Sequence, residues 1–204
     1  MSVLATDDFN RADAATLGSN WSRAFGSSAD MGIFSNQVDV ASANTFAMAY
    51  YNALAWPDDQ YSQAKVIALA SHSMMVICRA STATSTSWYG GGCGSSLFGN
   101  NNYRIARRIS GGSVTSLASV ATNVAANDVL KLECTGGTGP ALALYRNGSS
   151  MVTFTDSGGV SSGQAGLQAQ NNNGNVALWD DWEGGDFAAA GGTNRWLALL
   201  GVGS

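Results

Sequence analysis

Acidic residues near the end of the chain are of the type that glycan hydrolysis uses. Glycoside hydrolases place two carboxylates beside the scissile bond, one as the acid and the other as the nucleophile or base. Asp181 and Glu183 are two residues apart, so in a β-strand their side chains share one face. The other glutamate, Glu133, has no acidic residue close to it in the sequence. Asp181 and Glu183 are therefore the candidate pair for this chemistry.

The sequence lacks the residue patterns of a serine hydrolase and of a zinc site. The chain has no Gly-x-Ser-x-Gly turn and one histidine, His72, for which a structural or solvent-facing role is expected. Its three cysteines have neither the spacing of a disulfide framework nor that of a zinc site. Cys78 and Cys134 lie in apolar strand patterns, which predict buried thiols, whereas Cys93 lies among glycines and is expected to be the most accessible.

Sugar recognition is the second chemistry that the residues offer. Sugar rings stack on exposed aromatic side chains, and asparagine amides both donate to and accept from hydroxyls. Residues 88–103 supply both groups, and their glycines would let a ligand approach closely. The alternative is a Gly/Asn-rich loop whose aromatic side chains plug the edge of the fold. The candidate glycan-binding residues are Trp88, Tyr89, Phe98, Asn100, Asn101, Asn102 and Tyr103.

Composition and strand patterns indicate what must position these residues. A length of 204 residues with 12% charged residues, 25 glycines and two prolines favours one all-β domain with short strands. The net charge of -4 argues against nonspecific nucleic-acid binding, which needs clustered cations.

An alternating pattern predicts a strand at 33–41, and residues 61–70 and 74–80 are expected to form a hairpin joined by 71–73. Asn147-Gly148 predicts a tight hairpin. Residues 81–102 are expected to be the least regular stretch.

The two ends of the chain resemble a known family. After the Asn147-Gly148 hairpin come Gly163, Gly166 and a final strand ending in Trp179-Asp180-Asp181-Trp182-Glu183, and the chain opens with Asp7-Asp8-Phe9-Asn10-Arg11. This succession resembles concanavalin A-like lectin/glucanase (laminin-G-like) domains over residues 5–187. The resemblance implies a two-sheet antiparallel β-sandwich, a concanavalin A-like jelly roll, for residues 1–187.

The resemblance also bears on catalysis. Its glucanase branch carries a Glu-x-Asp-x-x-Glu motif on one strand, and this chain lacks that motif. In the other branches the acidic-aromatic residues of the last strand are structural. We therefore expect a protein that is not an enzyme, with hydrolysis by Asp181 and Glu183 as an alternative.

The resemblance points to one candidate metal site. Such domains often hold Ca²⁺, and their first and last strands commonly pair. Pairing would bring four carboxylates together, which repel one another unless a cation or Arg11 joins them. The candidate ligands are Asp7, Asp8, Asp180 and Asp181. No other cofactor is expected.

The C-terminal segment lies outside the resemblance. Residues 188–192 are a small-residue linker, and residues 193–204 are strongly apolar. They form either a last strand against their own domain or an arm that docks on a neighbouring subunit, since an uncovered apolar tail promotes association. The arm would use Arg195, Trp196, Leu197, Leu199 and Leu200.

The sequence also bears on where the protein is made and where it acts. The first residues, MSVLATDDFN, show no secretory leader, and no run approaches the roughly 18 apolar residues of a membrane span. Since lectin-like sandwiches usually act outside cells, release by lysis is an economical explanation. We expect a tailed-phage virion protein, either a capsid decoration or a tail-associated protein, that is made in the host cytoplasm. Its partners would be sister copies, other virion proteins and cell-surface glycans; the alternative is a soluble carbohydrate-binding module.

Overall fold

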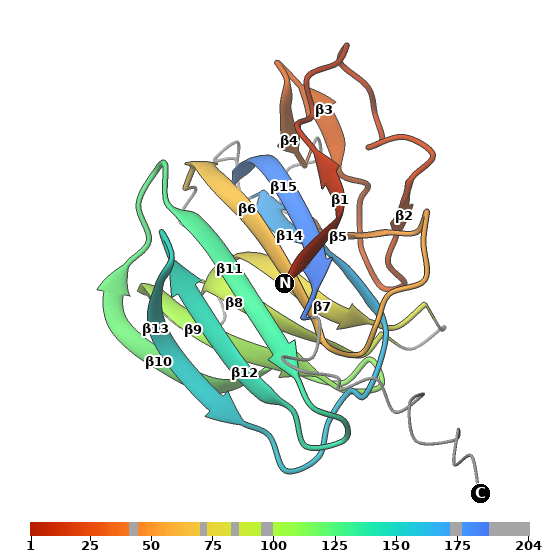
Figure 1. Cartoon of the computed structure of the whole chain (residues 1–204). Helices are drawn as coiled ribbons and strands as arrows, with labels where there is room; N and C mark the ends of the chain where they lie inside the picture. Colours follow the sequence, from red (N-terminus) through yellow and green to blue (C-terminus); the bar gives the residue numbers. More distant parts are fainter. Residues whose placement is uncertain (41–44, 70–72, 83–85, 95–99, 172–176, 188–204) are drawn as a thin grey trace, which may run out of the picture.

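The computed structural model of the chain is a β-sandwich of two antiparallel sheets packed face to face (Figure 1). It describes residues 1–40, 45–69, 73–82, 86–94, 100–171 and 177–187. These residues include no helix, and hence none that could cross a membrane. The predicted all-β sandwich is confirmed.

The first sheet, sheet A, has eight strands. The first and last strands of the described chain pair with each other in it, as the resemblance implied. The strand order is β13 (Ser149–Thr155), β12 (Ala141–Arg146), β11 (Val129–Thr135), β6 (Gln60–Ala68), β15 (Leu178–Asp186), β4 (Gln37–Asp39) and β3 (Gly32–Phe34), and β1 (Ser2–Asp7) also pairs with β15.

The second sheet, sheet B, has seven strands and lies behind sheet A in Figure 1. It contains a meander of four consecutive strands, followed by strands from both halves of the chain. The order is β10 (Thr115–Asn123), β9 (Asn100–Arg108), β8 (Trp88–Gly94), β7 (Met74–Ala80), β14 (Gln164–Asn171), β5 (Thr45–Tyr51) and β2 (Trp21–Arg23).

Alternate side chains of both sheets fill the space between them. On β11 the buried core positions are Leu130, Leu132 and Cys134, while the residues between them belong to the opposite face of the sheet. The glycines of β8 are needed for this packing, because a Cβ on Gly91 would lie 2.8 Å from Leu144 Cδ1. The core is thus continuous under the centre of both sheets.

Two sequence-based expectations about local structure are wrong. Residues 33–41 do not form one strand, since β3 and β4 are joined by a tight turn at Ser35 and Asn36, both with positive φ. Residues 61–70 and 74–80 do not form a hairpin, since β6 lies in sheet A and β7 lies in sheet B. Within the described part of residues 81–102, β8 and the start of β9 pair inside sheet B. The hairpin at Asn147-Gly148 is confirmed, with φ of 48° and 78°.

Candidate functional site

Pairing between β1 and β15 creates the candidate site. In this register Thr6 lies opposite Glu183 and Asp7 lies opposite Trp182. Asp7 accepts hydrogen bonds from Arg11 Nη1 at 2.6 Å and from Trp21 Nε1 at 2.8 Å. Its carboxylate is therefore engaged in holding the N-terminal segment against the core.

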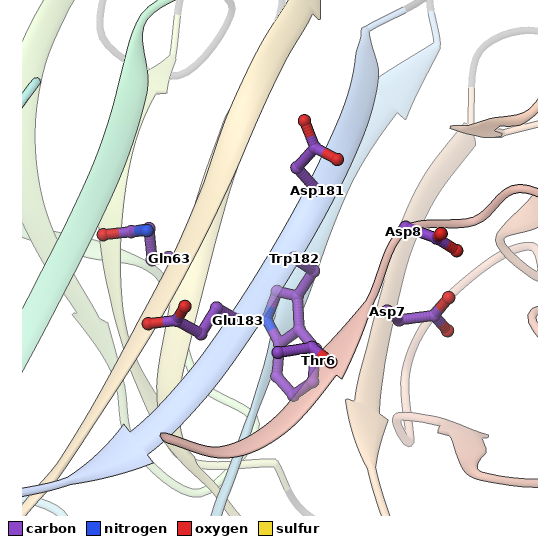
Figure 2. Close-up of a pocket in the computed structure, with 7 residues that line it drawn as sticks. All are labelled: Thr6, Asp7, Asp8, Gln63, Asp181, Trp182 and Glu183. Carbon is purple, nitrogen blue, oxygen red and sulfur yellow. The ribbon is translucent and has the colours of Figure 1, made fainter. Parts of the chain in front are cut away.

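An open hollow of about 540 Å³ lies beside this strand pair, at β1, β15 and β6 (Figure 2). Hydroxyl, amide and carboxylate groups line it, and all three strands are fixed by pairing within sheet A. The lining residues are Thr6, Asp7, Asp8, Gln63, Asp181, Trp182 and Glu183.

Glu183 is held in one position by a buried tyrosine. The Tyr61 hydroxyl donates to Glu183 Oε1 at 2.6 Å. The ring of Tyr61 occupies the space above Gly185, where a Cβ would lie 2.4 Å from the ring. Burial, together with the hydrogen bond to Glu183, raises the pKa of Tyr61, so its hydroxyl remains a donor at neutral pH.

Asp181 lies at an irregularity of β15. The pairing with β6 shifts register between Asp180 and Glu183, and Asp181 has a φ of 48°. Bulges of this kind redirect side chains. Asp181 is 58% exposed and lies 3.7 Å from Lys65 Nζ. In Figure 2 the Glu183 side chain is directed toward Gln63, whereas the Asp181 side chain is directed away from both.

The four aspartates predicted to bind Ca²⁺ are only partly brought together. Asp8 is exposed on the same hollow as Asp181 and binds the backbone and side chain of Asn10. Burial raises the pKa of Asp180, with smaller contributions from the charges of Asp181 and Asp8. Asp7 is bound by Arg11, the alternative that the sequence left open. Within the described ranges no three His, Cys, Asp or Glu side chains are grouped to hold a metal ion. Ca²⁺ binding stays a prediction.

The aromatic residues predicted to stack on sugar are not exposed. Trp88, Tyr89 and Tyr103 are each at most 1% exposed, because they belong to strands whose two faces are covered. Tyr89 donates to Asp156 Oδ2 at 2.7 Å, and Tyr103 donates to Asp128 Oδ2 at 2.5 Å. Trp88 packs in a cluster with residues such as Met75 and Ile77. These three are structural residues, and the prediction that they bind glycan by exposed stacking is wrong.

Most of the other predicted residues lie wholly or partly outside the described part of the chain. Asn102 is half-buried, and the side chains of Asn100 and Asn101 lie outside the description. His72, Phe98 and the whole 188–204 segment, with Arg195, Trp196, Leu197, Leu199 and Leu200, lie outside the described residues. Cys93, expected to be accessible, is fully buried.

Sequence reasoning missed three residues of the site: Thr6, Tyr61 and Gln63. Gln63 had a signal, since it alternates with the buried residues Ser62 and Ala64 and so must face away from the core. No local signal places it beside Glu183, which lies 120 residues later and pairs with it across the sheet.

Comparisons with known proteins agree with the fold. No protein-family model and no curated protein matches the chain. Among solved structures, the carbohydrate binding module CBM66 from Bacillus subtilis matches with a TM-score of 0.59 at 14% identity, over 82% of this chain and 98% of that one. A Bacillus licheniformis β-glucanase matches with a TM-score of 0.55 at 11% identity, over 88% and 96%.

A third similar structure is the carbohydrate recognition domain of Emp47p, with a TM-score of 0.55 at 10% identity, over 88% of this chain and 93% of that one. At these identities the three likenesses establish the concanavalin A-like sandwich and no more. The function must be argued from the site itself.

Proposed function

We propose that the protein is a non-enzymatic, lectin-like module that binds carbohydrate in the hollow at β1, β6 and β15. The observation that supports this most is the convergence of Thr6, Gln63 and Glu183 from three paired strands on one open hollow. Sugar hydroxyls need such a mixture of donors and acceptors, and a rigid sheet holds them with little ordering cost. Two of the similar structures are described as carbohydrate-binding, which supports the same function.

Binding without cleavage is favoured by the directions of the two acidic side chains. Hydrolysis requires two carboxyl groups directed at one bond, about 5–9.5 Å apart. Glu183 is directed toward Gln63 and already accepts from Tyr61, while the exposed Asp181 is directed away from it (Figure 2). This arrangement suits two separate contacts to hydroxyl groups.

Hydrolysis is the second candidate function, because Asp181 and Glu183 do line the same hollow. A similar structure is a β-glucanase, which is consistent with it. This candidate requires the wild-type protein to release reducing sugar from some polysaccharide and Glu183→Gln to abolish that release. Wild-type protein that binds a polysaccharide and leaves it intact decides for binding.

The virion role remains part of the proposal as a prediction. It depends on residues 188–204, which lie outside the described part of the chain. If they form an assembly arm, deleting them should leave the thermal melt of the sandwich unchanged and abolish incorporation into particles. Truncated protein that still assembles contradicts the arm.

The proposed function is tested by a glycan array with matched variants. We expect wild-type protein to bind at least one glycan, and Glu183→Gln and Gln63→Ala to weaken that binding about tenfold by removing a hydroxyl contact. Thr115→Ala, at an exposed position of edge strand β10, is the control and should bind like wild type. Absence of binding across neutral, acidic and amino sugars would remove the proposal.

A further inference from the structure

A second hollow of about 520 Å³ opens at β11, β12 and β13 in sheet A. Its lining includes the aromatic residues Tyr145 and Phe154, several hydroxyl groups and two small alanines. Phe154 packs against the core, so Tyr145 is the ring that can offer a surface for stacking beside groups that bind hydroxyls. Its outward-facing residues include Glu133, Ala143, Tyr145 and Thr153.

Strand pairing aligns the two hollows. Glu183 lies opposite Gln63, Gln63 lies opposite Lys131, and Lys131 lies opposite Tyr145. These four residues form a row that crosses the strands on one face of sheet A. The row spans three strand spacings, or about 14 Å. A ligand that reaches both ends of this row must be longer than a single sugar ring.

Lys131 makes the surface between the hollows continuous. Its ammonium lies 5.4 Å from the centroid of the Tyr61 ring and 5.0 Å from that of the Tyr145 ring, and 2.6 Å from Glu133 Oε1. Burial and the nearby Glu133 carboxylate raise the pKa of Tyr145. The contacts of Lys131 therefore connect the tyrosine that positions Glu183 to the tyrosine of the second hollow.

The charges on this face indicate the class of ligand. Lys65 and Lys131 are paired with Asp181 and Glu133. Asp8 and Glu183 have no ion-pair partner within the part of the chain that the structure describes. The face is therefore net negative, and it repels glycans that carry carboxylate or sulfate groups. It has no such conflict with a neutral glycan.

From this row we infer that the site takes an extended neutral oligosaccharide, laid across β15, β6, β11 and β12, with Tyr145 as the stacking platform for its far end. This inference rests on the proposed function and makes the second hollow part of the same site. Tyr145 is then the residue that distinguishes long chains from short ones, whereas Glu183 contacts chains of every length.

Affinity electrophoresis tests the charge class. The full-length protein is run through native gels that contain mixed-linkage β-glucan, xylan or galactomannan as neutral polymers, or alginate or polygalacturonate as acidic ones. We expect at least one neutral polymer to retard the protein and neither acidic polymer to do so. Retardation by an acidic polymer overturns the inferred ligand class, and retardation by no polymer overturns the proposed function with it.

Calorimetry with disaccharide and hexasaccharide fragments of the retarding polymer tests the second hollow. Tyr145→Ala should weaken hexasaccharide binding about tenfold and leave disaccharide binding unchanged. Tyr145→Phe keeps the ring and should bind like wild type, and thermal melts confirm that each variant is folded. If Glu183→Gln weakens the binding of both fragments while Tyr145→Ala binds both like wild type, the second hollow is excluded and the proposed function stands.

Discussion

At the scale of residues, the acidic side chains divide into structural and available groups. Asp128 and Asp156 are buried, and each accepts a hydrogen bond from a buried tyrosine and one from an arginine. Glu183 also accepts from a tyrosine, but it does so on an open hollow. A charge-assisted hydrogen bond to a fixed donor positions a carboxylate without using all of its acceptor capacity. Glu183 can therefore be both positioned and available to a ligand.

The buried tyrosines give a prediction for alkaline pH. Burial and a neighbouring carboxylate raise the pKa of Tyr61, Tyr89 and Tyr103 above the ordinary value of 10.0. The folded state therefore holds protons that the unfolded state releases, so their contribution to stability is complete below about pH 10 and is lost as the pH rises further. In an absorbance titration at alkaline pH, these three should ionise only as the protein unfolds. Ionisation of all six tyrosines near pH 10 in folded protein contradicts this.

The cysteines give a second prediction at this scale. Cys78, Cys93 and Cys134 are all fully buried, and burial raises the pKa of Cys93 to about 12. We expect a thiol reagent to label none of them in native protein and all three in denaturant. Rapid labelling of Cys93 in native protein would contradict its burial in β8.

At the scale of elements, strand pairing determines which residues meet. The hairpin at Asn147-Gly148 was predictable because turn chemistry is a local signal, and the final acidic-aromatic strand was implied by the resemblance. The turn at Ser35 and Asn36 was not predictable, since neither residue is a glycine although both have positive φ. Local patterns also could not show that both faces of β8 are covered, which buries Trp88 and Tyr89.

The site shows the same limit of local information. Asp181 and Glu183 were recognised because they are two residues apart on one strand. Gln63 and Tyr61 come from a strand more than a hundred residues earlier, and only the register of β6 against β15 brings them to Glu183. The acidic residues of the site could therefore be predicted from the sequence, whereas the residues of β6 that lie beside Glu183 could not.

A substitution at Gly185 tests how closely β1 and Tyr61 pack against β15. A Cβ at this position would lie 2.3 Å from the Ser2 carbonyl oxygen and 2.4 Å from the Tyr61 ring. Gly185→Ala should therefore displace both β1 and Tyr61, lowering the free energy of unfolding by about 1–3 kcal/mol. Gly137→Ala is the matched control, because its Cβ would meet nothing within 4 Å. Equal urea midpoints for the two variants would show that β1 and Tyr61 do not pack as described.

At the scale of the whole molecule, Arg79 joins loops at one end of the sandwich. This fully buried side chain donates to backbone carbonyls of three separate connections, which lie before β6, after β11 and after β13. Its acceptors are Asp58 O, Gly136 O, Gly137 O and Val160 O. Because these connections carry the chain into and between strands of both sheets, one side chain helps to hold the sheets in place.

Replacing Arg79 should therefore destabilise the whole sandwich. Arg79→Met leaves four carbonyls without a donor and should lower the free energy of unfolding by about 3 kcal/mol or more. Arg108→Met is the control, since within the described part of the chain Arg108 donates to the nearby carbonyls of Gly111 and Gly112 at the surface. Thermal melts should show a large drop for the first variant and a small one for the second. Equal melting temperatures would contradict this role of Arg79.

The central claim is that carbohydrate binds on the outer face of sheet A, and an NMR titration tests it most directly. Isotope-labelled full-length protein is titrated with the neutral polysaccharide fragment that binds. The amide signals of Thr6, Gln63, Lys131, Tyr145 and Glu183 should shift together and saturate with one affinity. Shifts confined to sheet B, for example at the exposed Thr115 and Ser119 of β10, would contradict the claim.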